Sequence, residues 1–325
     1  MTLRTYIIRR ILVVIPIFLL ISLIIFFMVH AAPGDPARIL VGERSRINPD
    51  VRDEWIRKLG LDQPVPVQYV LWLSRLLQGD LGYSFQNNQP ILEAITDRVQ
   101  LTLELMVAAE IMSLLIGVIL GVIAAVKHYS VIDGFTSLVA LIGYSTPNFW
   151  LAMMLILIFG LQLQWFPPGG TQTLGISFPT PLHSLVDHLK HLVLPVSVLV
   201  LVWTAYVFRL VRTSMLEVLG QDYITTARAK GLKERVVIYK HALRNALLPV
   251  ITYEGYSVGY LFAGAAVIEY VFNWLGLGSF IVEMTVLRDY PAVIGISVVI
   301  AVMVLLANLV ADLAYAFADP RIRYD

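Results

Sequence analysis

The chain has 325 residues, of which 58% are hydrophobic and only 14% are charged, with 24 Lys and Arg against 23 Asp and Glu. A water-soluble fold of this length would have to bury more apolar surface than its core can hold, so the composition indicates an integral membrane protein. The chain has no cysteine, which excludes disulfides, thiol catalysis and cysteine metal sites. The net charge of +1 says less than the distribution of charge along the chain.

Six apolar stretches reach the length of roughly 20 residues that a helix needs to cross the hydrocarbon layer. They cover about residues 11–29, 101–126, 135–163, 192–208, 246–268 and 292–317. We therefore expect an all-α, polytopic membrane protein with six transmembrane helices. The stretch at 192–208 is the shortest, and the one at 246–268 contains Glu254 and several glycines, so their ends are the least sharply defined.

The amino terminus also has features of a cleavable secretory signal. Three arginines precede its apolar run, and Val29-His30-Ala31 resembles the cleavage region of such a signal, which has small residues near the cut. The run extends over residues 11–29, however, and is longer than the 7–15 residues or so of a signal core. The sequence therefore favours a retained membrane helix.

Basic residues predict the orientation in the membrane, because Lys and Arg gather in short cytoplasmic loops. They precede the first stretch, follow the sixth, and lie between the second and third stretches. The largest group lies between the fourth and fifth stretches: Arg209, Arg212, Arg228, Lys230, Lys233, Arg235, Lys240 and Arg244. All these segments fall on one side, so we expect both termini in the cytoplasm (N-in/C-in).

This topology divides the chain into three parts. Residues 1–30 form the N-terminus and first transmembrane helix, 31–100 an extracytoplasmic, mostly helical cap, and 101–325 the core transmembrane domain with a cytoplasmic coupling segment at 209–249. In the cap, Asn48-Pro49 predicts a helix start, Gly60 a stop, and residues 65–77 an amphipathic helix. The cap either covers the outer mouth of the helices or contacts an extracytoplasmic partner.

The segment from Asp222 to Pro249 is too polar to lie in lipid, although apolar stretches flank it. Ala, Lys, Arg and Leu dominate it, which predicts short helices interrupted at Gly231. A basic helical loop of this length favours a docking site for a partner, whereas the alternative is a loop whose cations only set the topology. The chain contains no G-x-x-x-x-G-K-[ST] phosphate loop, so any ATP hydrolysis has to come from another chain.

Motifs along the whole chain resemble the permease subunits of binding-protein-dependent dipeptide and oligopeptide importers, which are ATP-binding-cassette (ABC) importers of the type I fold. The motifs are PGDPAR (33–38), LGLDQPVPVQYVLWL (59–73), GDLGYSF (79–85), TLEL (102–105), GYSTPNFW (143–150), DYITTARAKGL (222–232), HALRNALLPV (241–250), VFNWLGLG (271–278), RDYP (288–291) and ADPRIRY (318–324).

The resemblance implies a non-catalytic, multi-pass subunit of a prokaryotic inner (cytoplasmic) membrane. It implies a heterodimer with a second homologous permease subunit, two cytoplasmic ABC ATPase subunits and an extracytoplasmic solute-binding protein. This chain itself would bind no cofactor, metal or nucleic acid, because ATP and Mg would reside on the ATPase subunits. The substrate would be set largely by the binding protein, which leaves dipeptides, oligopeptides, glutathione, oligosaccharides and nickel open.

The resemblance also identifies the segment before the fifth stretch as the one that couples to the ATPase. The general motif has E-A-A, three residues, Gly, nine residues and I-x-L-P. Here Thr225-Thr226-Ala227 stands in the first place, Gly231 supplies the glycine, and Leu248-Pro249 comes about five residues late. Small Ala227 and Ala229 would let this helix approach a partner closely. The expected coupling residues are Asp222, Tyr223, Thr225, Thr226, Ala227, Arg228, Ala229, Lys230, Gly231 and Leu232.

Buried polar groups are the candidates for the solute pathway. Glu110 and Glu254 lie in apolar stretches, where a carboxylate either faces water or a cation or joins two helices by hydrogen bonds. In the third stretch, Pro147 removes a backbone hydrogen bond and predicts a kink, with nearby hydroxyl groups covering the freed carbonyls. A kink beside Tyr144 and Ser145 serves either a gate or packing.

Three other functions are less compatible with the sequence. His188 and His191 are spaced for one helical face and could bind a metal, but interfacial histidines are also common. A stand-alone channel or carrier would need an inverted repeat or a chain of intramembrane ionisable groups. An intramembrane enzyme would need a convergent nucleophile and base, and the sequence offers only scattered carboxylates.

Overall fold

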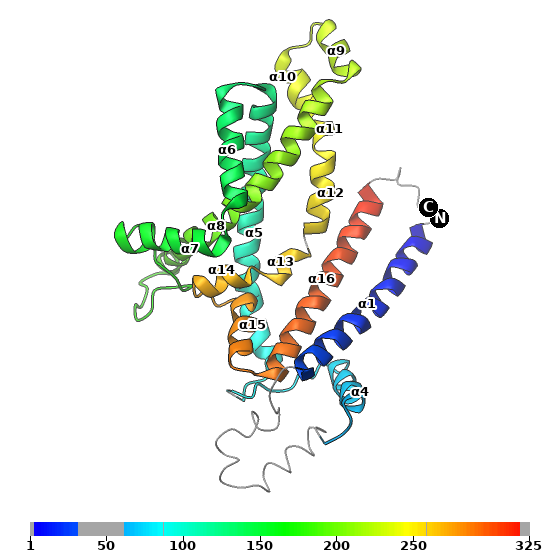
Figure 1. Ribbon diagram of the computed structural model, residues 1–325, viewed down its shortest axis with the longest axis vertical. Coiled ribbons are helices and arrows are strands. Elements are labelled where there is room, and N and C mark those ends of the chain that lie inside the picture. Colours follow the sequence, from blue (N-terminus) through cyan, green and yellow to red (C-terminus); the bar gives the residue numbers. More distant parts are fainter. Residues whose placement is uncertain (1–2, 32–61, 87, 258, 319–325) are drawn as a thin grey trace. The chain divides into compact units, whose positions relative to one another are not determined.

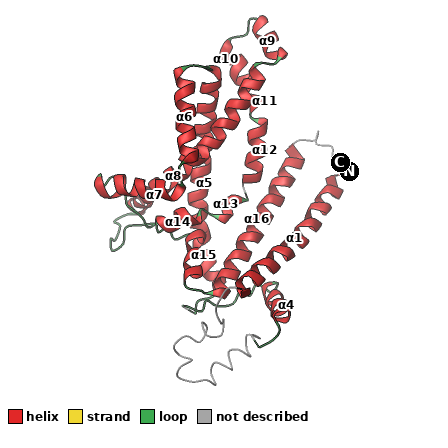
Figure 2. Ribbon diagram, viewed as in Figure 1, coloured by secondary structure: helices red, strands yellow, loops and turns green. Residues whose placement is uncertain are grey.

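The computed structural model describes residues 3–31, 62–86, 88–257 and 259–318, and helices dominate them (Figures 1 and 2). The helix expected between Asn48 and Gly60 lies outside the described residues. The chain forms two compact units, residues 1–101 with 276–325 (unit 1) and residues 102–275 (unit 2). These units group the chain by packing, whereas the three-part division by membrane topology stays a prediction.

Unit 1 contains α1 (Leu3–Ala31), α4 (Val65–Leu76), the first turns of α5 (Ile91–Val126), α15 (Leu277–Val286) and α16 (Tyr290–Ala318). Helices α1 and α16 lie side by side (Figure 1). The amphipathic helix expected at 65–77 is confirmed as α4. Its Tyr69 and Trp72 rings pack near the Phe26 ring, so α4 is anchored to the end of α1.

A buried aspartate joins two loops of unit 1. Asp289 is fully buried and accepts hydrogen bonds from the Ser84 hydroxyl and, at 3.1 Å, from the Gln86 backbone N–H. Its other oxygen accepts from the Ala292 N–H in the first turn of α16. A buried carboxylate needs such donors to offset its desolvation. The GDLGYSF and RDYP motifs are therefore two sides of one structural contact.

Unit 2 begins with the rest of α5. It then contains helices joined by short turns, a longer loop at 163–180 and two π-helical stretches: α6 (Val131–Ser145), α7 (Asn148–Leu155), η2 (Ile156–Gln162), α8 (Pro181–Leu219), α9 (Asp222–Ala229), α10 (Glu234–Val236), η3 (Val237–Ala242), α11 (Leu243–Ala246), α12 (Leu248–Ser257), α13 (Tyr260–Ala263) and α14 (Ala266–Val271). The ends of the long helices follow their sequence. Ser130 caps α6, and Thr180 followed by Pro181 starts α8.

Two glycines let α5 and α8 approach closely. A Cβ atom on Gly117 would lie 2.7 Å from the Val207 side chain, and one on Gly121 would lie 2.8 Å from the Val211 side chain. The four-residue spacing places both glycines on one face of α5, an arrangement typical of close crossings between membrane helices. Helix α8 is therefore fixed against α5 along this line.

Four described helices are long and apolar enough to cross a membrane, namely Arg9–Ala31, Ile91–Val126, Pro181–Leu219 and Tyr290–Leu313. A fifth span results if α6 and the α7–η2 helix, which meet at 103°, are counted together. The kink expected at Pro147 is thus confirmed. The Thr146 hydroxyl donates to the Ile142 carbonyl at 2.7 Å, but this carbonyl also accepts the Thr146 N–H and is not the Gly143 carbonyl that Pro147 leaves without its helical partner.

The expected fifth stretch, 246–268, is not one continuous helix. It comprises the end of α11, then α12, α13 and the start of α14, with a break at Gly264. Gly259 and Gly264 flank α13, where glycine lowers the helix propensity, and Gly264 has a positive φ. The count of six spans and the N-in/C-in orientation therefore stay predictions.

Candidate functional site

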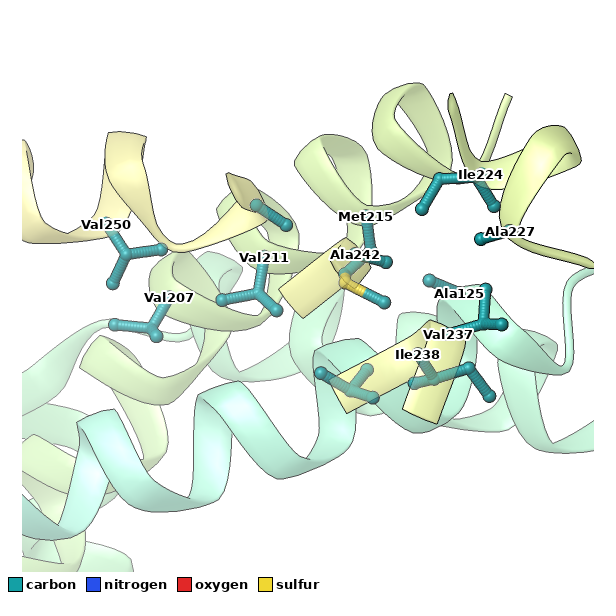
Figure 3. Close-up of a cluster of buried hydrophobic side chains, with 12 residues drawn as sticks. Ala125, Val207, Val211, Met215, Ile224, Ala227, Val237, Ile238, Ala242 and Val250 are labelled. Carbon is teal, nitrogen blue, oxygen red and sulfur yellow. The ribbon is translucent and has the colours of Figure 1, made fainter. Parts of the chain in front are cut away.

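Helix α9 in the expected coupling segment is anchored to the core of unit 2. Its Ile224 and Ala227 side chains are buried at 0% and 7% exposure and join a cluster with side chains of α5, α8, η3, α11 and α12 (Figure 3). Residues three apart lie on the same face of a helix, so these two side chains orient α9. The cluster links α9 directly to two long helices, α5 and α8.

The interruption expected at Gly231 is present and takes the form of a turn after α9. Gly231 has φ +75°, a left-handed conformation that favours glycine. Its N–H donates to the Arg228 carbonyl at 2.9 Å, and the Leu232 N–H donates to the Ala227 carbonyl at 3.4 Å. This pair of bonds is the Schellman motif, which satisfies the last carbonyls of a helix.

The outer face of α9 carries polar and cationic side chains. The Arg228 guanidinium donates two hydrogen bonds to the Glu234 carboxylate, at 2.7 and 3.3 Å. This guanidinium holds the pKa of the Glu234 carboxyl below its usual range, and the same hydrogen bond raises the pKa of Arg228. The Asn245 amide donates to the Tyr223 hydroxyl at 2.8 Å, which fixes α9 against α11.

Other cations in this region have no carboxylate partner among the described residues. They are exposed and project from the segment that runs from α9 to α11: Lys230, Lys233, Arg235, Lys240 and Arg244. An exposed group of unpaired cations favours contact with acidic side chains or anionic headgroups. We call this surface, together with the outer face of α9, the coupling surface.

The ten expected coupling residues do not all lie on the coupling surface. Nine of them are exposed, whereas Ala227 is buried in the protein's own core. Ala227 therefore anchors α9, and Ala229 is the small residue that remains open to a partner. Ile224 was missed, although its spacing of three from Ala227 within a polar helix is a signal that the sequence carries.

The structure brings Glu110 of α5 and Glu254 of α12 together. The Ser257 hydroxyl lies 2.9 Å from a Glu110 carboxylate oxygen and 3.2 Å from a Glu254 carboxylate oxygen. One hydroxyl has one proton, so it can donate to only one of them at a time. The other Glu254 oxygen is buried and has no hydrogen-bond partner among the described residues. Two carboxylates in apolar surroundings repel each other, so the pair favours a proton or a cation.

Tyr144 and Ser145 lie elsewhere in unit 2. The Tyr144 ring is 57% exposed, and the Arg209 guanidinium of α8 lies 5.0 Å from its centre. No described contact joins Tyr144 or Ser145 to the pair of glutamates. Sequence reasoning missed Ser257 and Arg209 as partners. The contacts of Ser257 with Glu110 and of Arg209 with Tyr144 join helices far apart in the chain, whereas the spacing of three between Glu254 and Ser257 is a local signal that the sequence carries.

A second group that the sequence did not single out lies where α6 meets α8. Asp133 is 4% exposed, and its carboxylate accepts hydrogen bonds from the Arg212 guanidinium at 2.6 and 2.8 Å. The His128 ring and the Tyr129 backbone N–H lie 3.1 Å from the same carboxylate. A bidentate pair of this kind fixes geometry as well as charge. We call these residues the Asp133–Arg212 clamp.

The histidines considered as metal ligands have other partners. The His188 ring nitrogens lie 2.9 Å from a Glu104 carboxylate oxygen and 2.8 Å from the Thr171 carbonyl. The His191 ring nitrogen Nδ1 lies 2.9 Å from the Asp187 carbonyl. The described parts of the chain contain no group of three or more His, Asp and Glu side chains suited to a metal ion. These histidines connect α8 with α5 and with the loop that precedes α8.

The sequence matches two family models. The family described as "Binding-protein-dependent transport system inner membrane component" matches residues 117–324, and the N-terminal family of the same membrane components matches residues 3–106. Similar proteins include the oligopeptide transport system permease protein AppB of Bacillus subtilis, which is 43% identical over 98% of this chain and 99% of its own length.

Two further relatives are similar over the same range. The dipeptide transport system permease protein DppB of Escherichia coli is 42% identical over 98% of each chain. The di/tripeptide transport system permease protein DppB of Pseudomonas aeruginosa is 39% identical over 98% of this chain and 99% of its own length. The similarity therefore extends over both units.

Proposed function

Because the chain belongs to the inner membrane components of binding-protein-dependent transport systems, we propose that it is a permease subunit that carries di- or oligopeptides into the cytoplasm. The observation that supports peptides as substrate is the similarity, over nearly the full length, to relatives named as peptide permeases. In this proposal, a second permease subunit completes the pathway and an external binding protein delivers the peptide. Partner ATPase subunits hold ATP and Mg and drive transport.

We further infer a multi-pass protein of the inner membrane with six spans and both termini inside. This count needs α6 with α7–η2 to form one interrupted span and α12 to α14 to belong to another. Such interruptions are tolerated in membranes where the irregular backbone is buried in protein or lines a water-filled cavity. The cations of the coupling surface then lie in the cytoplasm, as the distribution of charge predicts.

The coupling surface is the proposed contact with the ATPase. Its unpaired cations suit an acidic groove, and its helix α9 is anchored by Ile224 and Ala227 to the cluster that includes α5 and α8. A displacement of α9 would therefore move two long helices rather than a loose loop. ATP on the partner can change the state of the pathway only if it favours this contact in one state over the other.

Glu110, Glu254, Tyr144 and Ser145 are the proposed pathway residues of this subunit. A peptide carries a positively charged ammonium group. The two glutamates, which share a serine, would supply the negative charge that compensates it. The alternative role is structural, since Ser257 also joins α12 to α5. Glu110→Gln and Glu254→Gln distinguish the two roles. Loss of uptake in an assembled, stable complex supports the pathway role, whereas loss of assembly supports the structural one.

Reconstitution tests the proposed function. The chain is placed in lipid vesicles with its partner permease, its ATPase chains and its binding protein, and uptake of a labelled peptide is measured. We expect uptake that requires ATP, the binding protein and every chain. The matched control carries Lys230→Glu and Lys233→Glu on the coupling surface, which should weaken copurification of the ATPase and abolish uptake. Peptide uptake by this chain alone in vesicles would contradict the proposal.

A further inference from the structure

The break between α13 and α14 is the most unusual backbone feature of unit 2. It interrupts the apolar stretch 246–268, which the sequence predicts to cross the membrane. The short helices α13 and α14 follow one another at this break (Figure 1). Helix α13 has only four residues and α14 only six, and Gly264 between them has φ 71° and ψ 175°. This combination of angles is open essentially to glycine alone.

One backbone polar group at the break, the Gly264 N–H, is not covered by regular structure, whereas the Ala265 carbonyl accepts from the Glu269 N–H at 2.8 Å. The Gly264 N–H makes no cap bond to a described carbonyl, and Ala265 precedes α14 without a side-chain cap. Residues 261–266 are all partly exposed. An unpaired peptide group in hydrocarbon costs several kcal/mol, so a break at membrane depth has to face water or protein.

The surroundings hold the break in one shape. Glu269 of α14 and Thr102 of α5 are both fully buried, and the Thr102 hydroxyl donates to the Glu269 carboxylate at 3.0 Å. A Cβ atom on Gly264 would lie 2.8 Å from that carboxylate and 3.2 Å from a Thr102 methyl carbon. Helix α14 also packs against α7, which follows the interruption at Pro147. The break is therefore a defined element, packed onto two other helices.

We propose that residues 263–265 line the solute pathway and that Glu269 and Thr102 are positioning residues that hold this part of its wall. This inference rests on the proposed function, since a pathway requires that the chain carries a solute. Water in the pathway would satisfy the free Gly264 N–H, and the absence of a side chain at Gly264 lets the backbone lie directly against Glu269. An extended peptide, which has alternating N–H and C=O groups, is a solute that can replace this water.

The lack of cysteine makes a direct test possible, because single cysteines can be introduced without a background in this chain. Ala263→Cys and Ala265→Cys are prepared in the complete importer in vesicles and treated with a charged, water-soluble methanethiosulfonate. The matched control is Leu115→Cys, whose side chain is 58% exposed on an unbroken apolar part of α5. The increase in the mass of this chain measures the extent of cysteine modification.

We expect both cysteines at the break to react at least tenfold faster than the one at position 115. The rate of modification at position 265 is then measured with a saturating amount of peptide-loaded binding protein and with the ATPase trapped by vanadate. We expect this rate to differ severalfold from the rate in the untreated importer. Equal rates at the break and at position 115 would overturn the proposal, as would reactivity that is indifferent to peptide and to trapping. Uptake by the unmodified importer is measured in parallel. Absence of that uptake contradicts the proposed function, whereas uptake with unreactive cysteines contradicts only this inference.

The positioning role has its own test. Thr102→Val removes the hydroxyl with little change of shape, and we expect it to change the reactivity of Ala265→Cys at least threefold. The reactivity of a cysteine at Leu174, which is 94% exposed in the loop before α8 and lies outside the coupling surface, should stay the same. Thr102→Ser should restore the original reactivity at position 265. A purely structural role would give equal changes at both cysteines, or none, and would overturn the positioning role.

Discussion

Unit 2 ties α8 to its neighbours in two different ways. The cluster under α9 is made of apolar side chains from several helices, whereas the Asp133–Arg212 clamp is made of one bidentate ion pair with a histidine beside it. The loss of an apolar contact costs free energy in proportion to the lost volume. The loss of one partner in a buried ion pair leaves the other charge without compensation. A single substitution therefore incurs the full cost in free energy of unfolding. The cluster should therefore tolerate small changes, and the clamp should not.

Arg212→Ala should have the largest effect. It leaves Asp133 buried with only His128 and backbone or hydroxyl groups as partners, and we expect it to lower the free energy of unfolding by about 2–3 kcal/mol. Thermal unfolding of the purified complex measures the change. Arg212→Lys keeps the charge but loses the bidentate geometry and should cost less. Equal stability of Arg212→Ala and the unmodified protein would show that the clamp contributes nothing.

Ala227→Leu and Ala229→Leu sharpen the comparison within α9. Leucine at position 227 overpacks the cluster, and we expect a loss of about 1–3 kcal/mol in the free energy of unfolding. Leucine at the exposed position 229 should change stability by less than about 0.5 kcal/mol. Copurification of the ATPase separates the two roles. If Ala229→Leu left ATPase binding and uptake intact, the open face of α9 would not be the docking face.

Gly231→Ala should have a smaller effect. A Cβ atom at this position meets no other atom within 4 Å, so only the left-handed φ of 75° opposes the substitution. That conformation costs a residue other than glycine about 1 kcal/mol. Thermal unfolding should show this modest loss. Gly134→Ala is the control, because Gly134 lies in α6 with ordinary helical backbone and open space, and it should be neutral or stabilising.

The Arg228–Glu234 pair should give the smallest effect, because both side chains are exposed to solvent. The pKa of Glu234 is lower in the folded chain than its ordinary value of 4.5, so the unfolded chain binds a proton first as the pH falls. The contribution of the pair is therefore complete above that value and is lost as the pH falls below it. The difference in melting temperature between the unmodified protein and Glu234→Gln should narrow from pH 7 to pH 4. Glu217→Gln, at an exposed carboxylate outside the described ion pairs, should show no such change.

Features that depend on neighbouring residues were predicted correctly. The kink at Pro147 follows from a missing N–H, the turn at Gly231 from a residue without Cβ, and α4 from its apolar periodicity. The break at Gly264 was not predicted, although the glycine was visible. A glycine permits an unusual conformation without requiring it, and contact with Glu269 and Thr102 accompanies the one seen.

The sequence alone determined that the chain is an apolar, helical membrane protein, which segment is too polar for lipid, and which known transport subunits it resembles. Those conclusions rest on composition, on local periodicity and on order along the chain, which are all properties of neighbouring residues. Only the tertiary structure decided that Ala227 faces inward, that one serine lies between Glu110 and Glu254, and that Arg212 meets Asp133. Each of these contacts depends on the rotation of one helix relative to another, and the packing of side chains from distant segments sets that rotation.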